Sequence, residues 1–403
     1  MGRMITRGTG ARRTAGAHKA RANKTDASKK IALPGQVVLV LQGGGALGAF
    51  QVGAYEALRN AGIEPDWVIG TSIGAINGAI IAGNPPERRL ERLKTFWDGV
   101  QQGPASGTPV FFDGIGHSLA NLATFTRGIP TFFEPNPRSL LGAHAPVGIE
   151  DAAYYSTAPL RKTLADLVDL DYLNARHTRF TVGAVNASNG EMRYFDSRDQ
   201  AIDYSHIMAS GALPPAFPAV RIDGTPYWDG GIYSNTPVEA VLDDKPRRDS
   251  VIFTVNLWNP AGPEPESLWE VMAREKDIQY ASRATSHIMR QQQIHHLRHI
   301  IRELSKELPA KAASTAEMRE LASWGCGTVM HVVPLVAPPR AGEDQLKDID
   351  FTPSGIGDRM AAGLALTSRI VASAPWTQPV DEMEGIIVHE ELPAAPAVPR
   401  NER

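Results

Sequence analysis

The sequence stretch Gly70-Thr71-Ser72-Ile73-Gly74 decides the fold of this chain, because of what stands on either side of it. Residues 66–70 form a short, mostly apolar run typical of a strand, and residues 73–83 are small, apolar and free of proline, as at the start of a helix. The pattern G-x-S-x-G therefore falls at a strand-to-helix turn, which holds a serine oxygen clear of the backbone. Both glycines allow the tight turn without Cβ clashes. We predict a nucleophile at Ser72, with a simple packing turn as the alternative.

A second glycine-rich turn, Gly43-Gly44-Gly45-Ala46-Leu47-Gly48, follows the apolar strand predicted at residues 37–41 and precedes a helix predicted to end near residue 62. Its backbone N–H groups at a helix N-terminus suit an anion, either a phosphate or a developing oxyanion. The same letters fit the dinucleotide fingerprint G-x-G-x-x-G. That alternative needs an acidic residue at the end of the next strand, but Asp66 stands at its start.

A third turn contains Asp229, Gly230 and Gly231. An aspartate among glycines is often only a turn former that binds its own backbone. A serine hydroxyl, however, is a poor nucleophile until a neighbouring base accepts its proton. Together with Ser72, Asp229 is therefore predicted to be that base, in a turn that supplies N–H donors to its carboxylate.

These motifs, in this order, resemble the patatin-like phospholipases, and the resemblance runs from about residue 35 to residue 245. It includes the stretch Ala209-Ser210-Gly211-Ala212-Leu213-Pro214-Pro215-Ala216-Phe217-Pro218 and the tripeptide Asn235-Thr236-Pro237. The resemblance implies a Ser-Asp dyad without histidine, with Ser72 as nucleophile and Asp229 as proton acceptor. It also implies an oxyanion hole at Gly43, Gly44 and Gly45, and motif glycines at Gly48, Gly70, Gly74, Gly230 and Gly231. The chain departs from many members at Leu47, where they carry Arg or Lys.

A serine hydrolase with a histidine is the alternative among enzymes. Its order of serine, acid and histidine is available here, because His287, His295, His296, His299 and His331 all follow Asp229. The short spacing between the glycine loop and Ser72 argues against that fold. His295 and His299 lie one helical turn apart, as a metal pair would, but without a third ligand the sequence favours a solvated helix face. No metal or organic cofactor is predicted.

The pattern of strands and helices predicts an α/β fold with a mostly parallel central sheet flanked by helices. A hairpin is expected around Asn189-Gly190, and further strands at residues 251–257 and 329–336. We predict a basic disordered tail (1–34), a catalytic domain (35–260), a largely helical C-terminal extension (261–374) with a helix capped by Ser354, and a disordered tail (375–403).

Two segments leave alternatives open. Residues 103–150 are irregular and carry Phe111, Phe112, Phe125, Phe132 and Phe133, which either cap an acyl chain over Ser72 or only pack the insert on the body. Residues 266–308 predict one long polar helix or a helix pair. Its narrow apolar stripe, which includes Ile294 and Leu297, packs either on the core or on a second copy of the chain, giving a homo-oligomer.

Composition limits the class of protein. With 403 residues, 42% hydrophobic residues and a net charge of −3, the chain is typical of globular proteins. It has no secretory h-region and no long apolar run for a membrane span. A single cysteine, Cys326, fits a reducing cytoplasm. The basic residues before residue 31 suit a solvated tail or peripheral contact with anionic lipid; no nucleic-acid partner is expected.

The sequence therefore predicts a cytoplasmic serine acyl-ester hydrolase of the lipase or lysophospholipase type, acting on an acyl ester or lipid. The alternatives are a non-catalytic module that binds acyl groups or anions, and a dinucleotide-binding protein.

Overall fold

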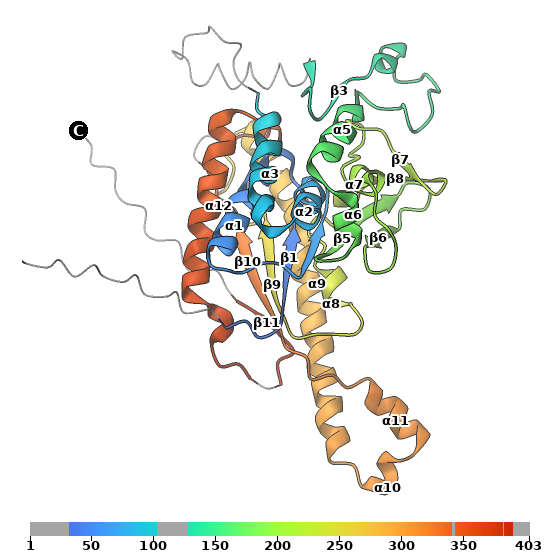
Figure 1. Cartoon of the computed structure of the whole chain (residues 1–403), viewed down its shortest axis with the longest axis vertical. Helices are drawn as coiled ribbons and strands as arrows, with labels where there is room; N and C mark the ends of the chain where they lie inside the picture. Colours follow the sequence, from blue (N-terminus) through green and yellow to red (C-terminus); the bar gives the residue numbers. More distant parts are fainter. Residues whose placement is uncertain (1–31, 103–126, 341–342, 382, 390–403) are drawn as a thin grey trace, which may run out of the picture. The chain divides into compact units, whose positions relative to one another are not determined.

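A computed structural model of the chain describes residues 32–102, 127–340, 343–381 and 383–389. Within these residues, nine strands form one sheet in the order β11-β10-β9-β1-β2-β5-β8-β7, with β6 paired to β5 (Figure 1). The strands from β11 to β5 run parallel to their neighbours, and β6, β7 and β8 pair antiparallel. The predicted mostly parallel α/β sheet is confirmed, as is the hairpin formed by β5 and β6.

The strands of the sheet are β1 (Gln36–Leu41), β2 (Trp67–Gly70), β5 (Arg179–Asn186), β6 (Met192–Asp196), β7 (Val220–Ile222), β8 (Thr225–Asp229), β9 (Ser250–Asn256), β10 (Met330–Val336) and β11 (Ile386–Val388). A separate two-stranded ribbon is formed by β3 (Glu134–Pro135) and β4 (Tyr155–Ser156).

The helices are α1 (Ala49–Asn60), α2 (Ile73–Ala82), α3 (Pro86–Gly99), α5 (Ala158–Leu167), α6 (Leu170–Asn174), α7 (Tyr204–Ser210), α8 (Glu239–Leu242), α9 (Leu268–Lys306), α10 (Ala310–Ala313), α11 (Ala316–Ser323) and α12 (Pro353–Ser373). Short 3₁₀ helices include residues Gly45–Gly48 and Lys347–Ile349.

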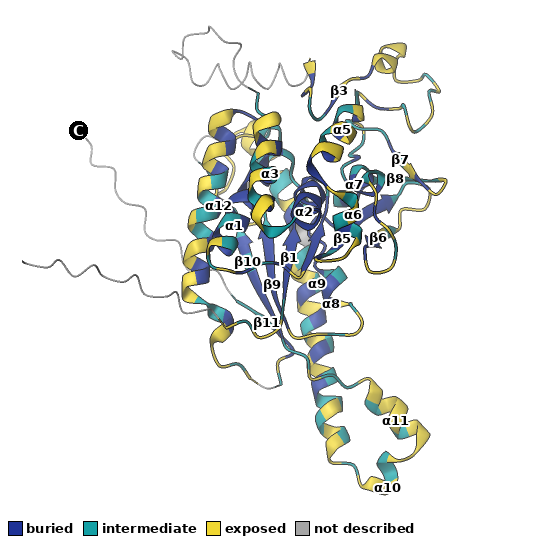
Figure 2. Ribbon diagram, viewed as in Figure 1, coloured by how far each residue is buried: buried dark blue, intermediate teal, exposed yellow. Residues whose placement is uncertain are grey.

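Alternating strand residues divide the core between the two faces of the sheet. On one face, Val38 and Ile252 belong to an apolar cluster with Val241 of α8 and Ile288 of α9. On the other face lies α2, which is buried along its whole length and appears dark blue between the sheet and the outer helices in Figure 2. A helix that is apolar all round needs such cover on every side, and α3 and α7 provide part of it.

The chain beyond residue 261 joins the same sheet. Strand β10 pairs with β9 in parallel, and α12 packs against α1. The cap of α12 is Thr352, whose side chain accepts a hydrogen bond from the Gly355 N–H, and not Ser354 as predicted. The helix predicted from residue 266 is confirmed as the single helix α9.

The disorder predicted from Pro375 does not extend over residues 375–381 and 383–389. Trp376 is 2% exposed and packs edge-on against Phe253, while β11 pairs with β10. One large aromatic side chain and one short strand are enough to hold this segment on the core, despite its polar composition. The rest of that tail, the basic tail up to residue 31, and Phe111, Phe112 and Phe125 lie outside the described residues.

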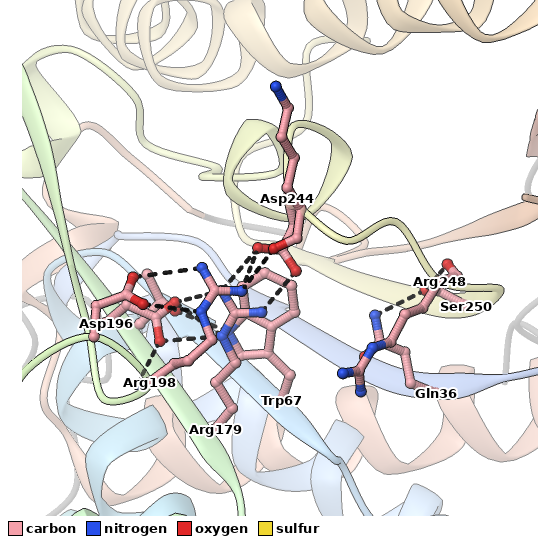
Figure 3. Close-up of polar contacts among 11 residues, drawn as sticks. Gln36, Trp67, Arg179, Asp196, Arg198, Asp244, Arg248 and Ser250 are labelled. Carbon is pink, nitrogen blue, oxygen red and sulfur yellow. Dashed lines mark hydrogen bonds and ion pairs between the residues drawn. The ribbon is translucent and has the colours of Figure 1, made fainter. Parts of the chain in front are cut away.

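An ionic cluster fixes the N-terminal end of the parallel strands, away from Ser72. The Arg179 guanidinium lies 3.5 Å from the centroid of the Trp67 ring and forms ion pairs with Asp196 and Asp244 at 2.6 and 2.8 Å (Figure 3). Arg198 reaches Asp244 as well, at 2.8 Å. The cluster ties β2, β5 and β6 to the residues after α8.

Among the described residues, none of the helices is long and apolar enough to span a bilayer.

Candidate active site

The serine turn is as tight as its sequence suggests. Ser72 lies between β2 and α2 with φ 56° and ψ −125°, a left-handed conformation that is costly for a residue with a side chain. A Cβ on Gly70 would overlap the carbonyl oxygen of Gly74, and one on Gly74 would overlap that of Leu41. The two glycines therefore let β1, β2 and α2 meet closely enough to hold Ser72 in this strained turn.

A second serine supports the turn from behind. The Ser72 N–H donates to Oγ of Ser210 at 3.0 Å, and the Ser210 hydroxyl donates to the carbonyl oxygen of Gly183 at 2.6 Å. Ser210 ends α7 and is completely buried, so its hydroxyl ties the turn to strand β5. Ser210 belongs to the stretch 209–218 that resembles the family, but the sequence alone predicts no role for it.

The glycine loop passes directly beside Ser72. A Cβ on Gly43 would come within 3.0 Å of the Ser72 Cβ, and Gly45 has a φ of 54°. The carbonyl oxygen of Gly43 accepts hydrogen bonds from Asn235 Nδ2 at 3.0 Å and from Trp258 Nε1 at 2.8 Å. In a trans peptide the following N–H, that of Gly44, points the opposite way from this carbonyl. The loop is thus held in one orientation by two side chains.

The three loop amides differ in their partners. The Gly43 N–H donates to the Asn235 carbonyl oxygen at 3.1 Å. Within the described residues, the N–H groups of Gly44 and Gly45 make no hydrogen bond. These two donors stand at the start of the 3₁₀ helix Gly45–Gly48, where a negative charge is favourable.

Asp229 ends strand β8 and is 2% exposed. Burial raises the pKa of its carboxyl group to about 7, although hydrogen bonds from the Ser72 side chain and from the Gly231 N–H act to lower it. The Gly231 N–H donates to Oδ1 at 2.7 Å, as expected of a turn that supplies donors to this carboxylate. The structure therefore brings a serine hydroxyl and a buried carboxylate with a neutral-range pKa into contact.

Ser72 and Asp229 share one cavity of about 180 Å³ with all three loop glycines and Gly231. The remaining motif glycines do not line the cavity. Gly48 packs on Ile73 and Trp97, and Gly230 packs on Gly183. Gly70 and Gly74 stand on either side of Ser72 in the turn. Much of the wall is aromatic, and it is formed by Phe132, Phe133, Tyr155, Phe217, Trp258, Tyr280 and Phe351. Phe132 and Phe133, the described members of the predicted set of phenylalanines, therefore lie at the site.

None of the described histidines lines this cavity. His295 and His299 lie on α9 but are 0% and 2% exposed, so the predicted solvated helix face is wrong for both, although their neighbour His296 is exposed. The segment before β11 covers them, because Gly385 lies against the Cβ of His295 and the ring of His299. Burial, and next the charge of Arg247, lower the pKa of His295 to about 4.

Several wall residues had no sequence signal at all. Trp258 follows β9 at the end of the predicted catalytic domain, and Tyr280, Asp348 and Phe351 come from the C-terminal extension, for which the sequence predicts no chemistry. Only their packing against the glycine loop places them at the site, and a single sequence does not encode that placement in a local pattern.

Comparison with known proteins identifies the family of this chain. A family model described as Patatin-like phospholipase matches residues 39–242, and one described as Patatin phospholipase matches residues 278–383. The Lysophospholipase nte1 of Aspergillus terreus is 61% identical over 261 residues, which cover 59% of this chain and 14% of the relative. The Lysophospholipase NTE1 of Yarrowia lipolytica is 28% identical over 286 residues, covering 63% and 17%.

This chain therefore spans less than a fifth of the length of these curated relatives. Among solved structures, VipD from Legionella pneumophila aligns with a TM-score of 0.38 and 16% identity, covering 85% of this chain and 67% of VipD. The first family model covers half of the 403 residues and contains the glycine loop, Ser72 and Asp229. The chain belongs to the patatin-like phospholipase family.

Proposed function

We propose that this protein hydrolyses acyl esters of the lipid or lysophospholipid type, with Ser72 as nucleophile and Asp229 as general base. The observation that carries the proposal is the contact between the Ser72 hydroxyl and the buried Asp229 carboxylate, in a largely apolar cavity beside two amides without partners. An apolar cavity suits an acyl chain, and the polar groups gather where the ester carbonyl would lie.

In the first half-reaction, Ser72 Oγ attacks the ester carbonyl carbon while its proton passes to Asp229. The N–H groups of Gly44 and Gly45 stabilise the tetrahedral oxyanion, and the Gly43 carbonyl anchors the loop that presents them. Collapse of this intermediate breaks the ester C–O bond, and the leaving alcohol takes the proton from Asp229. An acyl-Ser72 ester remains.

In the second half-reaction, Asp229 accepts a proton from water, and the resulting hydroxide attacks the acyl carbonyl. The same loop amides stabilise the second oxyanion. Collapse releases the carboxylic acid and returns the proton from Asp229 to Ser72 Oγ. An oxyanion donor of this kind typically contributes about 3–4 kcal/mol to lowering the barrier. Because Asn235 and Trp258 already hold the loop in place through the Gly43 carbonyl, the loop needs little reorganisation during the reaction.

The cavity also bears on the charge of the substrate. Among its described lining residues, Asp229 and Asp348 are the charged ones, and the lining includes no lysine or arginine. Leu47 removes the cation that many relatives place beside the loop. Uncharged acyl esters should therefore be hydrolysed at least as well as anionic phospholipids of equal acyl length. A strong preference for the anionic lipids would overturn this substrate assignment.

The test of the reaction is hydrolysis of an acyl-ester panel by the full chain and its variants. Ser72→Ala and Asp229→Asn should each lower kcat by roughly 10⁴-fold or more while the near-UV circular dichroism stays native. His287→Ala and His331→Ala serve as matched controls for the triad alternative and should keep wild-type activity. If the wild-type chain binds a fluorescent fatty acid but turns over no ester, the chain is a non-catalytic acyl-binding module.

A further inference from the structure

Two ion pairs cross between α9 and the 3₁₀ helix Lys347–Ile349. Lys276 Nζ lies 2.8 Å from Asp348 Oδ1 and 3.0 Å from Oδ2, and it also donates to the Gln345 carbonyl oxygen. Lys347 Nζ lies 2.6 Å from Asp277 Oδ1. Each helix therefore contributes one lysine and one aspartate at adjacent positions, and each charge meets its opposite on the other helix. We call these four residues the α9 clamp.

The α9 clamp lies on the glycine loop. Gly45 packs so closely against the carbonyl oxygen of Asp348 that a Cβ on Gly45 would overlap it. Lys347 Nζ is 5.4 Å from the centroid of the Trp258 ring, and Trp258 Nε1 in turn holds the Gly43 carbonyl. A shift of residues 347–349 would therefore release the surface against which the loop is seated.

The same segment forms one wall of the cavity that contains Ser72. Asp348, Ile349 and Phe351 line it. Phe351 stacks on Trp97 with ring centroids 6.4 Å apart and meets Phe132 at 6.5 Å, and its carbonyl oxygen accepts a hydrogen bond from Gln102 N–H at 2.8 Å. The segment is thus fixed at one end by aromatic packing and at the other by the α9 clamp.

We propose that the α9 clamp is a positioning device for acyl-ester hydrolysis: it seats the oxyanion loop through Gly45 and sets the acyl-facing wall formed by Ile349 and Phe351. The proposal rests on the proposed function. It makes the C-terminal part of the chain a determinant of rate and chain-length specificity. The Asp277–Lys347 pair is the better protected half, with side chains 17% and 11% exposed, so its charges are only weakly screened by water.

The electrostatics of the crossed arrangement make the proposal testable by charge exchange. Asp277→Lys alone places a third lysine beside Lys276 and Lys347, and Lys347→Asp alone places two carboxylates opposite each other. In both cases like charges repel across the contact, and the 3₁₀ helix moves off Gly45. The double variant Asp277→Lys, Lys347→Asp restores opposite charges across the contact.

The experiment compares these two single variants, the double variant and wild type on one short-chain and one long-chain neutral ester. Each single variant should lower kcat for both esters, because the oxyanion loop is displaced. It should also raise KM for the long ester, because the wall formed by Ile349 and Phe351 moves. We expect kcat/KM for the long ester to fall at least about tenfold and to return to within about threefold in the double variant. The Glu303–Lys306 pair on the same helix, 2.6 Å apart and outside the cavity, is the control; its reversal should change neither constant.

Hydrogen–deuterium exchange provides a readout that does not need catalysis. The Leu47 N–H, which donates to the Gly44 carbonyl oxygen at 3.1 Å, should exchange faster in each single variant and recover in the double variant. Single variants that lose thermal stability but keep wild-type kinetic constants and Leu47 exchange would overturn the proposal, as would a double variant that fails to recover. If wild type hydrolyses no ester, the proposed function fails, and the exchange measurement still decides whether the α9 clamp seats the loop.

Discussion

The Ser210 hydroxyl holds the backbone of Ser72 in its strained turn, by accepting the Ser72 N–H at 3.0 Å while it donates to the carbonyl oxygen of Gly183. The nucleophile is therefore connected through one buried side chain to strand β5, whose neighbour β8 ends in Asp229. Both members of the proposed dyad are thus held by the same part of the sheet.

Ser210→Ala should consequently lower kcat by about tenfold or more, because the Ser72 N–H loses its acceptor and the turn can relax. Ser197→Ala is the matched control, since Ser197 Oγ likewise accepts a buried N–H, that of Phe180, at 2.9 Å but lies outside the site cavity. Both variants should lose about 1–2 kcal/mol of stability in urea unfolding. Equal kinetic constants for the two variants would remove Ser210 from the positioning role.

The pH dependence of hydrolysis should report on Asp229. A general base must be ionised to accept a proton, and burial raises the pKa of this carboxyl group to about 7. Activity should therefore rise with pH, with a midpoint near 7 and a gain of about tenfold between pH 6 and pH 8. The measurement is kcat/KM for a neutral ester across this range, since the substrate itself does not titrate. A rate that is flat from pH 5 to pH 8 would contradict the assignment.

The ionised Asp229 carboxylate should lower the free energy of unfolding of the protein. Because the folded-state pKa lies above the ordinary value of an aspartate, the favourable contribution is complete below about pH 4 and is lost as pH rises through about 7. Asp229→Asn removes the ionisation and should stabilise the protein at pH 8 by an amount on the order of 4 kcal/mol, against roughly 1–2 kcal/mol at pH 5. Thermal unfolding at both pH values checks this; Ser72→Ala, which keeps the carboxyl group and removes a hydrogen bond that lowers its pKa, should show no stabilisation at pH 8.

Phe132 and Phe133 should govern chain length. Both line the cavity, and the Phe133 ring lies 4.9 Å from Tyr155 and 5.3 Å from Phe217, centroid to centroid. Since a buried methylene contributes about 0.8 kcal/mol, the double alanine variant should lose far more activity on long acyl esters than on short ones. Leu140→Ala, Leu141→Ala, which alters exposed side chains of the same insert, should affect neither. An equal loss at all lengths would favour the alternative that these rings only pack the insert.

The ionic cluster at the opposite end of the strands should matter for stability alone. Arg179→Met leaves Asp196 and Asp244 without their main partner and removes the contact with Trp67, so we expect a loss of about 3 kcal/mol in the free energy of unfolding. Arg198→Met, at a more exposed position, should cost less than about 1 kcal/mol. The kinetic constants of folded Arg179→Met should match wild type, because the cluster lies away from Ser72.

The parts of the site that sequence predicts are those built by local geometry. The glycines at residues 70 and 74 leave no room for a Cβ, so the turn they imply is the turn that forms. The wall residues Tyr280 and Phe351 are different, because only long-range packing brings them to the cavity. The predicted solvated position of His295 is wrong for the same reason. Its neighbours on α9 are polar, but the distant segment before β11 packs over it and buries it. Homo-oligomer formation, lipid-surface contact and a cytoplasmic location stay predictions.

The position of β1 in the middle of the sheet has a consequence for synthesis of the chain. Its partner β9 lies far along the sequence, with Gln36 and Ser250 separated by 214 residues. At a translation rate of roughly 5–20 residues per second, the nascent β1 waits roughly 10–40 s before that partner emerges from the ribosome. During this interval an apolar strand edge is open to other chains, so the yield of folded protein should depend on chaperone supply and growth temperature.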